Sequence, residues 1–461
     1  MSLIKSISGI RGTIGGVPGE GLSPLDIVKF TAAYATFMSR NSSCNSRTII
    51  VGRDARLSGP MVSDIVIGTL TAMGMDVVNI GPASTPTTEI AVVEEKACGG
   101  IILTASHNPK EWNALKLLNE NGEFLNDAQG KEVLRIAEAG EYSFASVDDL
   151  GHVYHNDTYN RRHIEKVLSL DLVDTEAIGK ADFTVAVDAV NSVGGTIIPQ
   201  LLRALGVKNI IELNCEATGK FAHTPEPIPQ NLTQISELMA DGKADVGFVV
   251  DPDVDRLAIV MEDGRMFVEE YTLVSIADYV LSHTPGATVS NLSSSRALRD
   301  VTERHGCPYS AAAVGEVNVT TKMKETGAVI GGEGNGGVIY PESHYGRDAL
   351  VGVALFLSLL AKSGKKVSEL RATYPAYEIA KNKIELTPEI DVDAILEAVK
   401  KRFAGERITD IDGVKIDFAD SWVHLRKSNT EPIIRIYSEA HTMKEADDLA
   451  DSIKAVIAEM V

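Results

Sequence analysis

Three stretches of the chain share one pattern of hydrophobic and polar positions. In each, an apolar strand leads into a polar loop, an amphipathic helix, a glycine and a second apolar strand. Strands that alternate with helices of this length predict βαβ units in mixed or parallel sheets. Their spacing of about a hundred residues is far longer than a solenoid repeat, so we expect three similar α/β domains. The predicted elements are Thr48–Val51, Pro60–Met73 and Val77–Ile80; Thr184–Val187, Gly195–Leu205 and Ile210–Leu213; and Thr288–Leu292, Arg296–His305 and Tyr309–Val314.

The last stretch of the chain follows a different pattern. From Tyr377 it predicts a strand, a helix over Asp391–Phe403, three strands and a helix over Met443–Met460. This order is typical of an α+β domain with an antiparallel sheet flanked by helices. The fold class is therefore α/β, with three α/β/α domains and a C-terminal α+β domain, which we expect around a central cleft. The predicted domains are residues 1–155, 156–255, 256–372 and 373–461.

Composition and charge narrow the possible partners. The 461 residues are 44% hydrophobic and 23% charged, with a net charge of −20. Such an acidic chain lacks the basic footprint of a nucleic-acid partner and disfavours anionic membrane surfaces. No apolar run reaches the roughly 18 residues that cross a bilayer, and the start of the chain lacks the pattern of a signal peptide. With four scattered cysteines and no CxxC pair, we expect a cytoplasmic protein with reduced thiols.

A serine loop follows a buried strand in the first domain. Gly99–Leu103 runs directly into Thr104-Ala105-Ser106-His107-Asn108-Pro109. Functional loops of α/β sheets lie beyond the carboxyl ends of strands, and Pro109 forces Asn108 out of helical conformation. In isolation this segment also fits a plain turn. The nucleophile interpretation depends on a matching metal site and phosphate site elsewhere in the chain.

An acidic loop supplies the metal site. Val246–Val250 is followed by Asp251-Pro252-Asp253-Val254-Asp255-Arg256 and a second apolar strand. Alternate residues of an extended segment point the same way, so the three carboxylates converge and resist joint ionisation without a cation. Oxygen ligands without histidine or cysteine favour Mg²⁺ over Zn²⁺. A solvated acidic turn is the alternative, and a Ca²⁺ loop fits less well because the glycine and glutamate of an EF-hand are absent.

Two further segments are typical of ligand loops. Gly331-Gly332-Glu333-Gly334-Asn335-Gly336-Gly337 lets backbone approach a ligand closely, and Glu333 can accept hydrogen bonds from sugar hydroxyls. Near the end, Arg426-Lys427-Ser428-Asn429-Thr430-Glu431-Pro432 and Arg435 gather cations and hydroxyls in a plausible anion site. An ordinary glycine-rich turn and a solvated basic turn are the respective alternatives.

These segments together resemble the α-D-phosphohexomutase family, which includes phosphoglucomutases, phosphomannomutases and phosphoglucosamine mutases. Thr104–Pro109 resembles the phosphoserine loop, Ser8-Gly9-Ile10-Arg11-Gly12 the SGIRG segment, and Asn113–Lys116 the NGFK segment. Asp251–Arg256 resembles the metal loop DGDxDR, with Pro252 in place of glycine. The glycine-rich loop resembles the sugar loop GExSG(H), and Arg426–Pro432 resembles the phosphate loop RPSGTEP.

The resemblance implies a role for each matching residue. Ser106 would carry the phosphoryl group and, with the three aspartates, ligate Mg²⁺, while Lys116 would shuttle protons. Arg11 and Arg256 would steady the phosphoryl oxygens, and His107 would orient the loop. The implied site residues are Ser106, His107, Lys116, Arg11 and Arg256 for catalysis; Ser106, Asp251, Asp253 and Asp255 for the metal; Glu333 and Asn335 for the sugar; and Arg426, Ser428, Asn429, Thr430 and Arg435 for the distal phosphate.

The implied reaction interconverts hexose 6-phosphate and hexose 1-phosphate through phospho-Ser106, with a hexose 1,6-bisphosphate as intermediate and activator. The Glu-Gly-Asn-Gly-Gly loop favours glucosamine 6-phosphate; phosphomannomutase or phosphoglucomutase activity is the alternative. A Mg²⁺-dependent sugar phosphatase and a non-catalytic sugar-phosphate sensor are more distant alternatives. We expect a monomer or homodimer whose last domain closes over the phosphosugar. His344 is interpreted as a surface loop residue, with a place near the sugar as the alternative.

Overall fold

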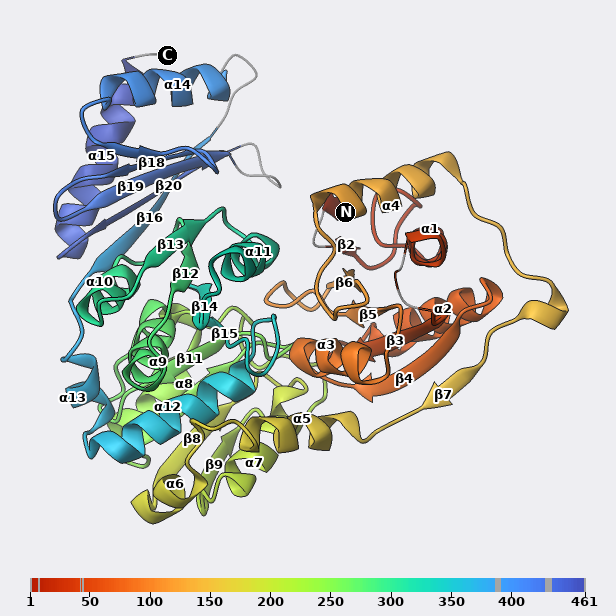
Figure 1. Ribbon diagram of the computed structural model, residues 1–461, viewed down its shortest axis with the longest axis horizontal. Helices are drawn as coiled ribbons and strands as arrows, with labels where there is room; N and C mark the ends of the chain where they lie inside the picture. The colour runs from red at the N-terminus through yellow and green to blue at the C-terminus, as the bar shows by residue number, and fades with distance from the viewer. Residues whose placement is uncertain are drawn as a thin grey trace. The chain divides into compact units, whose positions relative to one another are not determined.

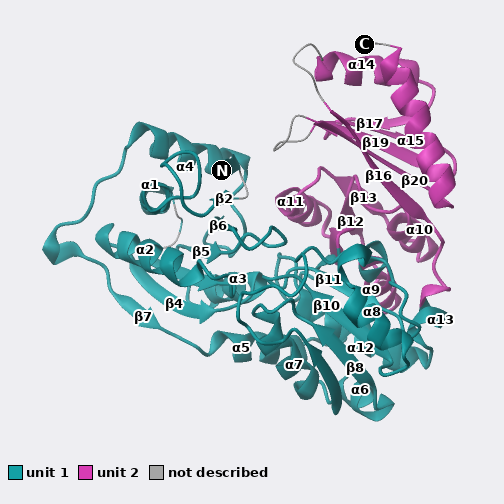
Figure 2. Cartoon of the chain, turned by 180° about the vertical axis from the view of Figure 1, so that it is seen from behind, with its two compact units in different colours: residues 1–272, 336–370 teal, residues 273–335, 371–461 magenta. Residues whose placement is uncertain are grey.

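A computed structural model of the protein describes residues 2–6, 9–41, 43, 45–385, 391–427 and 433–459. The chain forms two compact units, residues 1–272 with 336–370, and residues 273–335 with 371–461 (Figure 2). Figure 1 labels most of the helices and strands of both units. No helix among the described residues is both long and apolar enough to span a membrane.

The first sheet of the first unit is mixed, in the order β1-β2-β6-β5-β3-β4-β7. Strands β5, β3, β4 and β7 run parallel, whereas β6, β2 and β1 alternate in direction. The elements are β1 (Leu3–Ser6), β2 (Gly9–Thr13), α1 (Pro24–Asn41), β3 (Thr48–Arg53), α2 (Gly59–Ala72), β4 (Asp76–Pro82), α3 (Thr85–Glu94), β5 (Gly99–Leu103), β6 (Trp112–Leu118), α4 (Asp127–Ala139), a 3₁₀ turn (Val147–Asp149) and β7 (Val153–His155).

Helices cover both faces of this sheet because the buried residues of β5 alternate in direction. Ile101 and Leu103 join the hydrophobic core that α1, α2 and α4 complete. On the opposite face α3 packs against β3 and β5. There Gly100 permits the close approach, since a Cβ atom at this position would lie 2.7 Å from a methyl carbon of Val92. The loops after β3 and β5 are thereby held at one edge of a rigid layer.

The second sheet of the first unit has the order β11-β10-β8-β9. β8 pairs in parallel with β9 and β10, and β11 returns antiparallel to β10. The predicted boundary after Asp255 therefore falls within the loop between two paired strands. The remaining elements of the first unit are α5 (Tyr159–Leu168), α6 (Thr175–Ala181), β8 (Thr184–Asp188), α7 (Gly194–Ala204), β9 (Asn209–Leu213), a 3₁₀ turn (Pro229–Asn231), α8 (Thr233–Ala240), β10 (Val246–Val250), β11 (Leu257–Val260), β15 (Gly337–Ile339), which is not a strand of this sheet, and α12 (Ala349–Ser363).

The apolar helix α12 is mostly buried and packs against several elements of the first unit. It packs against α5, α6 and β11. Its Phe356 ring meets the rings of Phe248 and Phe267 edge to face, at centroid distances of 6.1 and 5.3 Å. These contacts place the start of α12 beside the loop between β10 and β11, where the Ala349 N–H donates to the Val254 carbonyl oxygen.

In the second unit, β12 pairs in parallel with both β13 and β14, and a separate antiparallel sheet has the order β16-β20-β19-β18-β17. Helices α14 and α15 pack on the antiparallel sheet. The elements are β12 (Thr288–Asn291), α10 (Ala297–Arg304), β13 (Tyr309–Ala312), α11 (Glu316–Thr326), β14 (Ile330–Glu333), β16 (Glu378–Glu385), α14 (Val392–Arg402), β17 (Arg407–Thr409), β18 (Val414–Asp417), β19 (Trp422–Lys427), β20 (Ile433–Ala440) and α15 (Met443–Ala458). The chain passes between units three times: within α9 (Glu269–His283), between Asn335 and Gly336, and within α13 (Val367–Arg371).

The three predicted βαβ units are confirmed. They are β3-α2-β4, β8-α7-β9 and β12-α10-β13, and the two strands of each pair in parallel. The C-terminal antiparallel sheet is also confirmed. Strands β1, β2, β6, β7, β14, β15 and β17 were not predicted. β17 has three residues and β2 is rich in glycine, so neither carries the alternation that marks a strand.

Candidate active site

The serine loop connects β5 to β6 and holds Ser106 in a strained conformation. Ser106 has φ of 47°, in the left-handed region that non-glycine residues rarely adopt. Its N–H donates to the Thr104 hydroxyl oxygen at 3.0 Å. Its side chain is almost fully buried, and its Oγ donates to Asp251 Oδ2 at 2.8 Å. The predicted meeting of this hydroxyl with the acidic loop is therefore present.

The three aspartates converge as the sequence predicts. Their side chains are fully buried, and one oxygen from each lies within 4.8 Å of the others. Val254, between the second and third aspartates, has φ of 63°, and Asp251 Oδ1 accepts the N–H groups of Asp255 and Arg256 at 3.2 Å. A left-handed, β-branched residue is costly, so this loop is held in shape by its surroundings.

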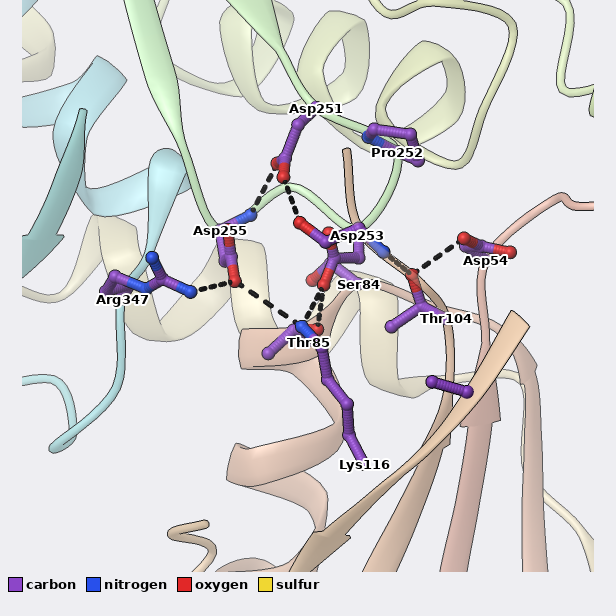
Figure 3. A network of polar contacts seen from close by, with 12 residues as sticks. Asp54, Ser84, Thr85, Thr104, Lys116, Asp251, Pro252, Asp253, Asp255 and Arg347 are labelled. Atoms are coloured by element: carbon purple, nitrogen blue, oxygen red, sulfur yellow. Dashed lines mark hydrogen bonds and ion pairs between the residues drawn. The ribbon is translucent and has the colours of Figure 1, made fainter. Parts of the chain in front are cut away.

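The carboxylates are not unpaired, and here the sequence interpretation was incomplete. Lys116 Nζ lies 2.7 Å from Asp253 Oδ2 and 3.7 Å from Asp255 Oδ2. Asp255 Oδ2 also accepts from the Arg347 guanidinium at 2.7 Å. Figure 3 shows these cations beside the acidic loop. Since Lys116 and Arg347 are 137 and 92 residues away from their partners, local sequence patterns do not predict the pairing.

Burial and neighbouring charges shift the pKa values of two of the three acids in opposite directions. Burial and the carboxylates of Asp255 and Asp253 raise the pKa of Asp251 well above its ordinary value. Burial alone would raise the pKa of Asp253 too, but the Lys116 ammonium outweighs it and lowers that pKa. Lys116 and Arg347 thus compensate Asp253 and Asp255 directly, and the Arg256 guanidinium lies 3.8 Å from Asp255 Oδ1.

The site fits a divalent metal ion. Within the described part of the chain, Asp253 Oδ1 and Asp255 Oδ1 are buried without a hydrogen-bond partner. Buried oxygens of this kind are costly unless a cation or water satisfies them. Three carboxylates and the Ser106 hydroxyl form an all-oxygen donor set, which suits Mg²⁺. Asp251, Asp253, Asp255 and Ser106 are the residues that would hold it.

Lys116 lies on β6 and is buried beside these acids. Burial alone would lower the pKa of its ammonium, but Asp253 and Asp255 outweigh that effect, and the pKa is raised. Lys116 is therefore protonated near neutral pH in this arrangement. A buried ammonium beside a reacting hydroxyl is a candidate proton donor.

Positive charge also surrounds the serine loop. Arg11, on β2, donates from Nη1 to Asn108 Oδ1 at 3.1 Å, and burial together with the charge of Arg256 lowers its pKa. Within the described residues Arg256 Nε has no hydrogen-bond partner, although Asp255 Oδ1 lies 3.8 Å away. Burial and the charges of Arg256 and Arg11 lower the pKa of His107 to about 2, so its ring is neutral. Such a cluster suits phosphoryl oxygens.

Several residues that support the site were not predicted. Thr85, the first residue of α3, donates its hydroxyl to Asp253 Oδ2 at 2.6 Å. Asp54 and Arg56, directly after β3, contact the serine loop. Asp54 and Arg56 lie beyond the carboxyl end of a parallel strand, as Ser106 does. This position was the sequence signal that could have identified them.

His344 is largely enclosed, with 11% of its side chain exposed, which corrects the expectation of a surface residue. Its Nδ1 lies 3.2 Å from Glu89 Oε2 and its Nε2 lies 3.1 Å from Asp348 Oδ2. Asp348 also binds His163 Nε2 at 2.8 Å and caps the start of α12. Burial alone would lower the pKa of His344, but these carboxylates outweigh it and raise the pKa to about 10. This network fixes the position of Asp348, which directly follows Arg347.

The predicted sugar-binding residues, Glu333 and Asn335, lie in the second unit. Glu333 ends β14 and is buried, and its Oε1 accepts from Asn291 Nδ2 at 2.8 Å and from the Gly315 N–H at 3.1 Å. Asn335, two residues further, is half-buried. These bonds fix the carboxylate at the carboxyl ends of parallel strands, where ligands bind in α/β sheets.

The predicted phosphate site is described in part. Arg426 on β19 and Arg435 on β20 are cross-strand partners in the antiparallel sheet, and Arg426 Nη1 lies 3.7 Å from Asp412 Oδ2. Like charges opposite one another are unfavourable by themselves, and an anion would relieve the repulsion. Ser428, Asn429 and Thr430 lie outside the described residues.

Comparisons with known proteins agree with this arrangement. Four models of phosphoglucomutase/phosphomannomutase domains match the chain: α/β/α domains I, II and III at residues 3–143, 161–264 and 269–377, and the C-terminal domain at 382–456. A phosphoglucomutase/phosphomannomutase of Thermococcus kodakarensis is 36% identical over 94% of this chain and 95% of its own length. A probable phosphoglucosamine mutase of Methanopyrus kandleri is 32% identical over 98% and 96%.

Solved structures show the same fold. The crystal structure of a phosphoglucomutase/phosphomannomutase family protein from Burkholderia thailandensis has a TM-score of 0.82 and 25% identity, covering 98% of this chain and 97% of that one. The matched domains span nearly the whole chain and include the serine loop, the acidic loop and the arginine pair. The chain belongs to the α-D-phosphohexomutase family and is a phosphohexomutase.

Proposed function

We propose that the protein interconverts hexose 6-phosphate and hexose 1-phosphate through phospho-Ser106, with glucosamine 6-phosphate as the preferred substrate. The observation that carries the mechanism is the 2.8 Å contact between Ser106 Oγ and Asp251 within the acidic cluster. A hydroxyl there lies beside carboxylates that fit Mg²⁺ and a buried ammonium. Phosphoryl transfer needs this combination of alignment and charge neutralisation.

In the first half-reaction, a sugar hydroxyl oxygen attacks the phosphorus of phospho-Ser106. The bond from phosphorus to the sugar oxygen forms, the bond to Oγ breaks, and the hydroxyl proton is passed on so that Ser106 ends as a neutral alcohol. The product is a hexose 1,6-bisphosphate. The second half-reaction reverses these steps with the other phosphate, which returns phospho-Ser106 and releases the isomeric monophosphate.

Each protein group has a task in this scheme. Lys116 donates and recovers the proton, and Arg11 and Arg256 bind the phosphoryl oxygens. A bound Mg²⁺ would neutralise charge on the transferred group. Arg426, Ser428, Asn429, Thr430 and Arg435 bind the phosphate that is not transferred, and Glu333 and Asn335 bind the sugar. His107 keeps the serine loop oriented and, being neutral, adds no charge.

The choice of glucosamine rests on the Glu-Gly-Asn-Gly-Gly loop and on the names of relatives such as that of Methanopyrus kandleri. The buried Glu333 carboxylate offers a partner for a protonated amino group. The Thermococcus kodakarensis relative favours a second candidate, glucose or mannose phosphates. An enzyme of sugar-phosphate metabolism would act in the cytoplasm with its substrates.

Turnover on three substrates tests the proposal. Purified protein with Mg²⁺ and glucose 1,6-bisphosphate is assayed on glucosamine 6-phosphate, glucose 6-phosphate and mannose 6-phosphate. We expect the highest kcat/KM on glucosamine 6-phosphate. A higher value on either of the others would reassign the substrate. Release of inorganic phosphate at the rate of substrate loss would replace the mutase mechanism with a phosphatase.

A further inference from the structure

The turn after β3 holds a buried arginine that the proposed mechanism does not use. Arg56 is 1% exposed. Its Nη2 donates to the carbonyl oxygens of Ser106 and Asn108, the latter at 2.7 Å. Its Nη1 donates to the carbonyl oxygens of Pro109 and Trp112 at 2.7 and 3.0 Å. One guanidinium thus binds four carbonyl groups between Ser106 and the start of β6.

Asp54 connects this arginine to the other side of Ser106. Its Oδ2 accepts from Arg56 Nε at 3.0 Å and from the Thr104 hydroxyl at 2.7 Å. The Thr104 oxygen in turn accepts the Ser106 N–H at 3.0 Å. The Asp54 carboxylate therefore fixes the peptide group before Ser106 through Thr104, and the peptide group after Ser106 through Arg56. Figure 3 shows Asp54 directed at Thr104.

The backbone of Ser106 needs such support. A left-handed serine is unfavourable and persists only where its surroundings over-determine it. The planar guanidinium presents five donors in a fixed geometry, and a lysine ammonium presents three on a flexible stem. Only arginine can therefore hold these four carbonyl groups and Asp54 at once.

The same turn also contacts the acidic loop. The Ala55 N–H donates to Ser192 Oγ at 3.4 Å, and this hydroxyl donates to the Pro252 carbonyl oxygen at 2.6 Å. The ring of Phe221 lies against the Arg56 guanidinium, with 5.0 Å between the ring centroid and Cζ. The serine loop therefore contacts the turn Asp54–Arg56 directly, and the acidic loop is connected to the same turn through Ser192.

We propose that Asp54 and Arg56 are positioning residues for phosphoryl transfer. They hold Ser106 in its left-handed conformation and keep its hydroxyl in register with the acidic loop. This inference rests on the proposed function and deepens it, because it assigns the alignment of the nucleophile to groups that touch neither substrate nor metal. Misplacement of a reacting group by about 1 Å costs on the order of 100-fold in rate.

The test compares Arg56→Lys with Arg53→Lys. Arg53 ends the same strand and donates to the Asp54 carbonyl oxygen, so it is a matched control. Phosphorylation of Ser106 by glucose 1,6-bisphosphate is followed by rapid quench and intact mass, and kcat and KM are measured well below the thermal midpoint, per folded molecule. For Arg56→Lys we expect both the phosphorylation rate and kcat to fall about 100-fold, with KM within about twofold. Arg53→Lys should stay within about twofold of wild type.

Chemical rescue separates positioning from general damage to the fold. In Arg56→Gly, added guanidinium chloride at millimolar concentration should raise kcat at least about tenfold over its value without the salt, because the free cation can occupy the vacated site. It should not change wild-type kcat. Asp54→Asn keeps the shape of the side chain but weakens its hydrogen bonds to Arg56 and Thr104, so kcat should fall about tenfold.

Three outcomes would overturn the proposal, and they distinguish failure of the positioning role from failure of the proposed function. Wild-type rates of Ser106 phosphorylation in Arg56→Lys would refute the positioning role alone, as would a loss of kcat that rescue leaves unchanged. A wild-type chain that gains no phosphate on Ser106 would refute the phosphoserine mechanism, and the positioning role with it.

Discussion

The acidic cluster of the first unit and the arginine pair of the second unit differ in how their like charges are compensated. In the first, Lys116 and Arg347 compensate two of the three carboxylates from distant parts of the chain. In the second, Arg426 and Arg435 are placed opposite each other on adjacent strands. The first arrangement is largely assembled without a ligand. The second places like charges opposite each other, and we expect a bound anion to complete it. Loss of a group should therefore affect the chemical step in one case and substrate binding in the other.

The largest effect is expected at Ser106. Ser106→Ala removes the atom that carries the phosphoryl group, so kcat should fall by at least about 10⁴-fold. Substrate binding should be nearly unchanged, because the arginine pair is intact. Coupled kinetics and calorimetry measure the two quantities, with Ser143→Ala, an exposed serine, as the control. Appreciable mutase turnover in Ser106→Ala would contradict the mechanism.

The second largest effect is expected when the metal is removed. Chelation is expected to lower kcat by at least about 100-fold, with recovery when Mg²⁺ is restored, because the transferred charge loses its counterion. Asp253→Asn should weaken Mg²⁺ binding, measured by titration calorimetry. Asp263→Asn, at the far end of β11 and paired with Arg265, is the control. Equal Mg²⁺ affinity in wild type and Asp253→Asn would remove this residue from the metal site.

The arginine pair should show the complementary behaviour. Arg435→Ala is expected to raise KM about 10- to 100-fold with a smaller change in kcat, since a charge-assisted hydrogen bond to a phosphate contributes about 1.5–3 kcal/mol. The effect should shrink at high salt. Arg407→Ala, an exposed arginine on the same sheet, should change neither constant. A loss in kcat alone would place Arg435 in the transfer step instead.

The smallest effect concerns pH and stability. The pKa of His344 is raised to about 10, so its ion pairs with Glu89 and Asp348 stabilise the fold fully below its ordinary value near 6.5. That contribution is lost as pH rises towards 10. Between pH 7 and 10 the thermal midpoint of the wild type should fall about 3 °C more than that of His344→Gln. His155→Gln, an exposed histidine, should behave as wild type. Parallel curves for wild type and His344→Gln would contradict this.

Much of the fold follows from the sequence because the βαβ pattern is local. An apolar strand, a loop and an amphipathic helix are each visible within about fifteen residues, and β3-α2-β4 and its two counterparts have the predicted order and direction. The convergence of Asp251, Asp253 and Asp255 is also local, since alternation along an extended segment determines it.

What the sequence did not predict depends on pairing across the chain. Lys116 was expected as a proton shuttle, but its ion pair with Asp253 arises only when β6 and the loop after β10 come together. His344 was expected at the surface because its loop is polar, whereas Glu89 and Asp348 make its burial favourable. The only signal for Arg56 was its place after β3, because four of its five side-chain partners are carbonyl groups, which every residue carries.

The left-handed conformation of Ser106 sets stability against activity at the position of the nucleophile. Glycine and asparagine adopt φ near 47° more readily than serine, so either would relax the chain by about 1 kcal/mol while removing the hydroxyl. A library selected only for heat resistance should therefore enrich inactive sequences at position 106. Directed evolution of a more durable enzyme would have to screen for turnover at the same time.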